Sequence, residues 1–278
     1  MERAQILGTE LMYEVQGTGE PVLLLHTAFL RDAFRTLLNQ PALRGRYQFI
    51  MYYRRGYGAS RPASTPFGID EQAQDALALL DYLGIARAHV VGHSFGANIA
   101  VQIALSAPER VTCLVLAEPA LVFLMSADVV QALMTAVGQA LAIYAGGDKA
   151  GAVDSYMTAA LGSQWKAPLE RFSPTAEADA ITDADAAFAI EMAALGTWAV
   201  GPEQLQQISV PTLSIAHSDP VDPFWQGFQQ VHEGIVRLIP QTESTMVPRS
   251  SHLLSVENPQ VVAEALDVFF RQQTVTQR

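Results

Sequence analysis

Cysteine is nearly absent from this chain, since Cys113 is the single one among 278 residues. One cysteine excludes an intramolecular disulfide framework, and its surroundings, RVTCLVLA, predict a small buried thiol rather than a reactive one. Basic residues are also scarce, with 17 Lys and Arg against 28 Asp and Glu and a net charge of −11. Nucleic-acid recognition needs a positive surface that displaces counterions. We therefore expect no nucleic-acid partner and no attraction to anionic membranes.

Targeting and membrane signals are missing as well. The first fifteen residues, MERAQILGTELMYEV, lack the basic segment and apolar core of a signal peptide, and no apolar run is expected to reach the length of a membrane span. Half of the residues are apolar, so a chain of this length can bury a sizeable core. The sequence predicts a cytoplasmic protein, either a monomer or a homodimer.

Short apolar segments alternate with helical patterns along the first part of the chain. Residues 69–83 repeat apolar side chains with helical spacing and stop before Gly84, which predicts a helix and its end. Such alternation favours parallel strands joined by right-handed crossovers, so we expect a doubly wound α/β sheet with helices on both faces. The expected strands are AQILG, ELMYEVQ, PVLLLH, YQFIMYY, AHVVG, RVTCLVLAEPA, VPTLSIA and IVRLIP, and PQVVAEALDVFFRQQ is expected to form a closing amphipathic helix.

This alternation stops between about residues 119 and 207. Helical patterns rich in alanine and methionine fill the stretch without a convincing strand, and a structureless loop of that length is improbable. We therefore expect a helical insertion, 119–207, between two parts of one core, 1–118 and 208–278. Its acidic residues are expected to form a solvated helix face. They are Glu177, Asp179, Asp183, Asp185 and Glu191.

One short stretch carries a pattern with chemical meaning. Gly92-His93-Ser94-Phe95-Gly96 fits G-x-S-x-G between a buried strand and a helix. Ser94 Oγ would then stand at the carboxyl edge of the sheet, where open α/β sheets bind ligands. The helix start would direct free amide groups toward developing negative charge. We interpret Ser94 as a nucleophile and expect its neighbour His93 to be a packing residue.

A serine hydroxyl needs a base that accepts its proton during attack. His252, in VPRSSHLLSVENP, lies between the last strand and the terminal helix and can reach the same sheet edge. His217 is the second candidate for the base. His89 begins the elbow strand and so lies at the wrong end, whereas His26 is a candidate for shaping an oxyanion loop. We favour His252.

The motifs LLLHTAF, RRGYGAS, GHSFG, AHSDPVDP and SSHLLSVENP together resemble the α/β-hydrolase superfamily along essentially the whole chain. The resemblance implies a mostly parallel eight-stranded sheet, with Ser94 as the nucleophile and His252 as the base. It also implies that the helical insertion is a cap over the nucleophile. RRGYGAS lacks the lysine and spacing of a P-loop, so we expect it to be a structural turn.

The resemblance further implies an oxyanion hole formed by the backbone N–H groups of Ala28 and Phe95. Two positions depart from the usual pattern. Thr27 replaces the glycine that normally follows the loop histidine, which makes the assignment of Ala28 the weaker of the two. Ser251 replaces a glycine common before the base, and we expect this change to be tolerated.

Two carboxylates could orient the imidazole of His252. Asp219 lies in AHSDPVDP, the loop in which the resemblance places the acid, and we favour it. Glu118 ends the apolar strand LVLAEPA, where an imidazolium partner would offset the desolvation of a carboxylate. Some family members, the zearalenone-type lactonases, are similar in having a catalytic glutamate at that earlier strand end.

A serine at the elbow predicts acyl transfer, with hydrolysis of a carboxylic ester or lactone through an acyl-enzyme. A carbon–carbon bond hydrolase, a cofactor-free perhydrolase and a receptor-like binding protein with slow turnover remain alternatives. Without a metal cluster or a dinucleotide fingerprint, we expect no metal and no cofactor. Large apolar residues of the insertion favour a small hydrophobic substrate. They are Met125, Met134, Met157, Phe188, Met192 and Trp198.

Overall fold

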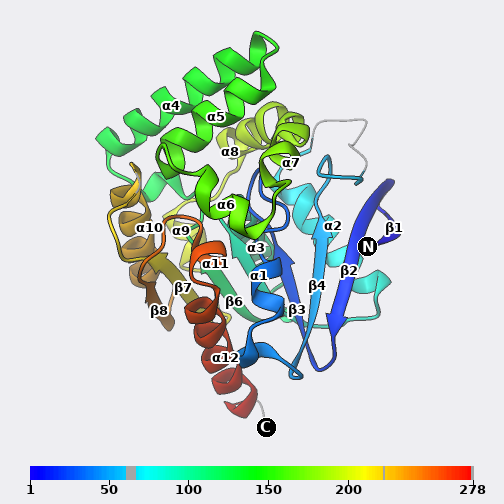
Figure 1. Ribbon diagram of the computed structural model, residues 1–278. Coiled ribbons are helices and arrows are strands. Elements are labelled where there is room, and N and C mark those ends of the chain that lie inside the picture. Colours follow the sequence, from blue (N-terminus) through cyan, green and yellow to red (C-terminus); the bar gives the residue numbers. More distant parts are fainter. Residues whose placement is uncertain (61–66, 222, 277–278) are drawn as a thin grey trace.

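The computed structural model describes residues 1–60, 67–221 and 223–276. Its central sheet has eight strands in the order β1-β2-β4-β3-β5-β6-β7-β8 (Figure 1). β2 pairs antiparallel with β1 and β4, and the remaining pairs are parallel. The predicted fold class is therefore confirmed. The strands are β1 (Glu2–Ile6), β2 (Thr9–Gly17), β3 (Glu20–Leu25), β4 (Tyr47–Tyr53), β5 (Ala88–His93), β6 (Val111–Ala117), β7 (Thr212–His217) and β8 (Thr242–Val247).

Helices cover both faces of this sheet because its central strands are apolar on both sides. In β3, Leu23 and Leu25 face one core cluster, whereas Val22 and Leu24 face the other. The first face is covered by α2, α3 and α10, and the second by α1, α11 and α12. These helices are α1 (Arg35–Leu38), α2 (Ile69–Tyr82), α3 (Phe95–Ser106), α10 (Trp225–Leu238), α11 (Leu254–Glu257) and α12 (Pro259–Thr276).

One predicted strand, IVRLIP, is wrong. Its first residues form the last turn of α10, and the strand that pairs with β7 is β8. Val231 and Ile235 lie one helical turn apart and are both fully buried, so the apolar spacing belongs to a helix face. A short apolar run cannot be separated from a buried helix turn by its periodicity alone.

Between β6 and β7 the described chain contains helices and no strand. We call residues 119–207 the helical segment. Most of its helices gather beyond one end of the sheet (Figure 1). The division of this segment from the core as a separate domain stays a prediction. The helices of this segment are a 3₁₀ turn (Val122–Leu124), α4 (Ala127–Ala145), α5 (Lys149–Leu161), α6 (Lys166–Phe172), α7 (Ala176–Thr182), a π-helical turn (Ala186–Glu191), α8 (Met192–Thr197) and α9 (Pro202–Leu205).

α4 differs from the expectation that no run is long and apolar enough to cross a membrane. By length and composition it passes that test, with 19 residues and a mean hydropathy of 1.3, and little of it is buried. One helix of this kind is weak evidence for a membrane span. Its exposure reflects its position at the outer side of the helical segment, where it packs mainly against α5 (Figure 1).

Candidate functional site

Ser94 occupies a strained turn between β5 and α3. Its backbone has φ 53° and ψ −121°, a conformation that costs energy in a residue with a side chain. A Cβ on Gly96 would lie 2.1 Å from the carbonyl oxygen of Leu25, and one on Gly92 would lie 2.5 Å from the Cα of Ala97. The glycines of the G-x-S-x-G pattern are therefore required by backbone contacts on both sides of the serine.

Two backbone amides lie at the start of α3 and in the loop after β3. Neither the Phe95 nor the Ala28 N–H group donates to a protein acceptor within the described part of the chain. Phe95 is the first residue of α3, so its amide belongs to the unsatisfied N-terminal donors of that helix. Such amides can stabilise a negative oxygen.

His26 holds the loop that contains Ala28. Burial, followed by the charge of Arg54, lowers the pKa of His26 well below its ordinary value, so its imidazole is neutral. Its Nε2 accepts from the backbone N–H of Arg54 at 3.2 Å, which leaves the proton on Nδ1 to be donated to the Thr27 carbonyl at 2.8 Å. His26 thus holds the loop in its conformation through both ring nitrogens. Thr27 is buried in the same loop, with only 5% of its surface exposed.

His252 lies in the loop after β8 with its ring against three side chains. Its Nδ1 is 2.6 Å from Glu118 Oε2. The ring of Phe228 stacks on it at 4.2 Å with an interplanar angle of 8°, and the ring of His93 lies 4.8 Å away. These contacts restrict the imidazole to one orientation beside the residue that precedes Ser94.

Glu118 follows β6 directly and is almost fully buried, with φ 45°. His217 bonds the other carboxylate oxygen, Oε1, through its backbone N at 2.7 Å and its Nδ1 at 2.5 Å. Burial alone would raise the pKa of Glu118, but the hydrogen bonds from His217 and His252 outweigh it and lower the pKa from 4.5 to about 2. Glu118 is therefore a carboxylate at neutral pH, and it can only accept hydrogen bonds.

The structure separates Asp219 from the imidazole, contrary to our preference for it as the acid. Asp219 Oδ2 accepts the backbone N–H of Arg249 at 2.5 Å, and Oδ1 accepts from Ser218 Oγ at 3.3 Å. Arg249 has φ 53°, so a turn after β8 directs its amide to Asp219. The carboxylate bonded to His252 is Glu118, the alternative that burial at the strand end favoured.

Backbone hydrogen bonds among the three neighbouring strands β5, β6 and β7 bring Ser94 and Glu118 to one edge of the sheet. The amide of Ser94 donates to the carbonyl of Ala117 at 2.9 Å, and the amide of Glu118 donates to that of Ile215 at 3.2 Å. Residue 94 thus continues the ladder from β5 to β6, and residue 118 continues it from β6 to β7. Carboxyl ends of parallel strands are where open α/β sheets bind ligands.

His93, Glu118 and His252 also meet the spacing of a metal site, since each offers a ligand atom and these atoms lie within 4.8 Å of one another. Both Glu118 oxygens already accept imidazole hydrogen bonds, so a metal would have to displace them. Burial, then the charge of His252, lowers the pKa of His93 to about 3, and its ring is neutral. The arrangement fits a hydrogen-bonded acid–base pair better than a metal centre.

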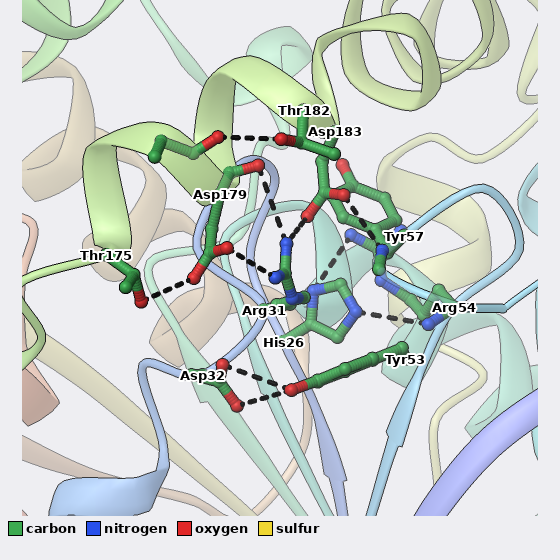
Figure 2. Close-up of polar contacts among 12 residues, drawn as sticks. His26, Arg31, Asp32, Tyr53, Arg54, Tyr57, Thr175, Asp179, Thr182 and Asp183 are labelled. Carbon is green, nitrogen blue, oxygen red and sulfur yellow. Dashed lines mark hydrogen bonds and ion pairs between the residues drawn. The ribbon is translucent and has the colours of Figure 1, made fainter.

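Two arginines join the core loops to the helical segment, the partly exposed Arg31 and the buried Arg54. Arg31 Nη2 lies 2.7 Å from Asp179 Oδ1, and Arg31 also pairs with Asp183, whose side chain is 1% exposed (Figure 2). Asp183 Oδ1 further accepts the backbone N–H of Gly58 at 2.8 Å. The prediction of a solvated acidic face is therefore wrong for Asp183, because it neutralises an arginine from a different part of the chain.

Arg54 is the second of these arginines and pairs with Glu191, with both side chains 1% exposed. Its guanidinium also donates to Gln72 Oε1 at 2.7 Å and to the Thr27 carbonyl at 3.3 Å. Glu191 ends the π-helical turn and accepts from Tyr57 Oη at 2.7 Å. Glu191 is thus a second exception to the solvated face, and it ties the helical segment to the loop beside Ala28. The RRGYGAS segment forms a structural turn in this network.

The apolar residues singled out in the helical segment occupy different places. Phe188 is buried with its ring 5.0 Å from that of Phe29, which follows Ala28, and Met157 lies in the same cluster. Met134 is half exposed. Trp198 donates its indole N–H to Gln102 Oε1 of α3 at 2.9 Å and lines an outer groove.

Comparisons with known proteins agree with this architecture. A family model for the alpha/beta hydrolase fold matches residues 20–259. A protein of Azorhizobium caulinodans that carries the name carbamate hydrolase RutD is 38% identical over 110 residues, which are 38% of this chain and 39% of that protein. The chain thus spans less than half the length of the curated relatives it matches first.

Solved structures share the fold over nearly the whole chain. A thermophilic esterase from Thermogutta terrifontis superimposes with a TM-score of 0.77 at 22% identity, covering 98% of this chain and 99% of the esterase. The enol-lactonase of Burkholderia xenovorans LB400 gives a TM-score of 0.75 at 18% identity, covering 97% and 100%. Because the family model also spans most of the sequence, this chain belongs to the alpha/beta hydrolase family.

Proposed function

We propose that this hydrolase is a serine hydrolase that cleaves a carboxylic ester or lactone of a small hydrophobic substrate. The observation that carries the proposal is the Glu118–His252 pair, at 2.6 Å, at the same sheet edge as the strained Ser94. An oriented imidazole beside a serine in a nucleophile elbow is the arrangement that acyl transfer requires.

The proposed first step is attack of Ser94 Oγ on the carbonyl carbon. His252 Nε2 takes the hydroxyl proton, because its Nδ1 proton is engaged by the Glu118 carboxylate. The same imidazole then gives the proton to the leaving oxygen, and an acyl-enzyme remains on Ser94. A water molecule activated by His252 releases the acid in the second half of the reaction.

The free amides of Phe95 and Ala28 are proposed to stabilise the tetrahedral oxyanion in both halves. Each such donor is typically worth about 3 to 4 kcal/mol of transition-state stabilisation. His26, through its bond to the Thr27 carbonyl, and Arg54, through the same carbonyl, would keep the Ala28 amide in position. Thr27 in place of glycine is compatible with this role because its carbonyl, not its side chain, is the anchored group.

The helical segment is proposed to act as a cap that selects the substrate. Its apolar cluster around Phe188 packs on Phe29, beside the Ala28 amide, which favours a hydrophobic acyl or alcohol group. An esterase and an enol-lactonase among the structures of the same fold support the two substrate classes. The name carbamate hydrolase of one relative makes carbamates a third class to test.

The test is a hydrolysis panel of short-chain aryl esters, aliphatic esters, lactones and carbamates with the wild type and Ser94→Ala. We expect ester or lactone turnover that falls by roughly 10³-fold or more in Ser94→Ala, because only binding and the oxyanion donors remain. Ser106→Ala is the matched control, since Ser106 is exposed at the far end of α3 and bonds only its own helix.

Near-normal turnover in Ser94→Ala would refute the proposed mechanism. Turnover of carbamates alone would refute the proposed ester or lactone substrate, but it would agree with Ser94 as the nucleophile. Cleavage of a vinylogous diketone alone would favour the carbon–carbon bond hydrolase. Ligand binding with a negligible rate on every substrate would favour the receptor-like alternative.

A further inference from the structure

Glu118 lies between two histidines, although a triad of nucleophile, base and acid contains only one histidine. His252 Nδ1 contacts one carboxylate oxygen at 2.6 Å and His217 Nδ1 contacts the other at 2.5 Å. His217 is the last residue of β7 and has no exposed surface. Phe228 of α10 packs on both imidazoles, at 4.2 Å from the ring of His252 and 5.8 Å from that of His217.

The protonation of these rings follows from the charge of the carboxylate. An ionised carboxylate has no proton to donate, so each contact requires an N–H on the histidine. His217 and His252 therefore both carry the proton on Nδ1. For His252 this is the tautomer that leaves Nε2 free to accept the proton of Ser94.

We propose that His217 is a positioning residue that holds the Glu118 carboxylate in the rotation that directs Oε2 to His252. This inference rests on the proposed function and adds His217, which has no role in the mechanism proposed above. The backbone N–H of His217 also donates to Oε1 at 2.7 Å. The side chain and the main chain of His217 therefore hold the same oxygen of Glu118. With Oε1 held at two donors, Oε2 remains for the base.

The positioning role has a physical cause in the weak torsional preference of a glutamate carboxylate. The last torsion of this side chain is broad and roughly two-fold, so rotation can move Oε2 away from His252. A second imidazole donor removes that freedom. Groups that orient a directly acting side chain are commonly worth 10- to 100-fold in activity at metal sites, and a hydrogen bond to a charged group corresponds to a comparable factor.

A matched pair of variants separates the hydrogen bond from the volume of the ring. His217→Asn keeps an N–H donor near the position of Nδ1, whereas His217→Leu has nearly the same shape as asparagine without the donor. We expect His217→Leu to lower kcat for p-nitrophenyl butyrate by about 10- to 100-fold with KM nearly unchanged. His217→Asn should restore most of that loss. Circular dichroism and thermal unfolding check the fold of both variants.

A second readout does not depend on turnover. In protein labelled with ¹⁵N-histidine, the Nδ1 proton of His252 should resonate far downfield in the wild type, shift in His217→Leu, and return toward the wild-type position in His217→Asn. If the leucine variant does not fold, His217→Gln replaces it, because its longer side chain moves the amide away from the Nδ1 position.

The proposal is overturned if folded His217→Leu keeps both the wild-type kcat and the wild-type His252 resonance. It is also overturned if His217→Asn is as impaired as His217→Leu. Failure of the proposed function has a different signature, because Ser94→Ala would then retain the wild-type activity. The resonance of His252 would still report whether His217 orients the pair.

Discussion

Removal of the carboxylate from Glu191 should destabilise the fold far more than its place in an alanine-rich helical stretch suggests. In Glu191→Gln the guanidinium of Arg54, 1% exposed, loses its anion and keeps only neutral acceptors, which are Gln72 Oε1, Thr27 O and the amide oxygen of the substituted side chain. Removing one partner of a buried ion pair typically costs about 3 to 5 kcal/mol, because the remaining charge stays desolvated. We expect a loss of unfolding free energy in that range.

The assay is urea unfolding at pH 7 followed by circular dichroism. With a slope of about 3 kcal/mol per molar urea, the expected loss lowers the midpoint by about 1 to 2 M without a change in slope. Asp185→Asn is the control, since the Lys149–Asp185 pair has side chains 44% and 60% exposed and such surface pairs contribute about 0 to 1 kcal/mol.

A double-mutant cycle with Arg54→Met isolates the pair from other effects. Because the charge and its counterion disappear together, the double variant should be less destabilised than the sum of the single variants by about 1 to 3 kcal/mol. A loss below about 1 kcal/mol in Glu191→Gln, equal to that of the surface control, would refute the argument that this pair is desolvated.

Three further outcomes are expected. Glu118→Gln should lower kcat by roughly 10⁴-fold, because the imidazole loses the acceptor that sets its tautomer, whereas Asp219→Asn should cost less than about tenfold; the reverse order of the two rates would restore the loop aspartate as the acid. The pKa of Glu118 is lowered from an ordinary 4.5 to about 2, and the resulting stabilisation of the fold is complete above pH 4.5 and disappears as the pH falls toward 2. The unfolding free energy of the wild type should therefore drop by about 3 kcal/mol more than that of Glu118→Gln between pH 4.5 and 2. Parallel pH profiles of the two proteins would contradict this. Gly96→Ala should lose several kcal/mol of stability or fail to fold, because its Cβ would meet the Leu25 carbonyl at 2.1 Å. Gly138→Ala in α4, with nothing within 4 Å of the added Cβ, should instead gain about 0.5 to 1 kcal/mol. Equal midpoints of the two variants in a thermal melt would refute the backbone clash at Gly96.

The sheet and the elbow follow from local features of the sequence. Continuous apolar strands such as PVLLLH must be covered on both faces, and alternating helices cover them in a doubly wound arrangement. Gly92 is demanded by a contact within the consecutive strand, turn and helix, because its Cβ would meet Ala97. Gly96 is demanded by the carbonyl of Leu25 in the neighbouring strand β3, so only its motif, and not this contact, is local. Glu118 carried a local signal as well, because a carboxylate at the end of a buried strand needs a partner.

The choice between Glu118 and Asp219 depended on loops that are far apart in the sequence. His252 and Glu118 are 134 positions apart, and the Arg249 amide that binds Asp219 exists in that place only once the turn after β8 has formed. The same holds for Glu191, whose partner Arg54 is 137 positions away. Periodicity and short motifs report which side of a strand or helix faces the core. Which buried charges meet is decided by the tertiary packing of the loops and of the helical segment, because a desolvated charge must find its counterion in space and not along the chain.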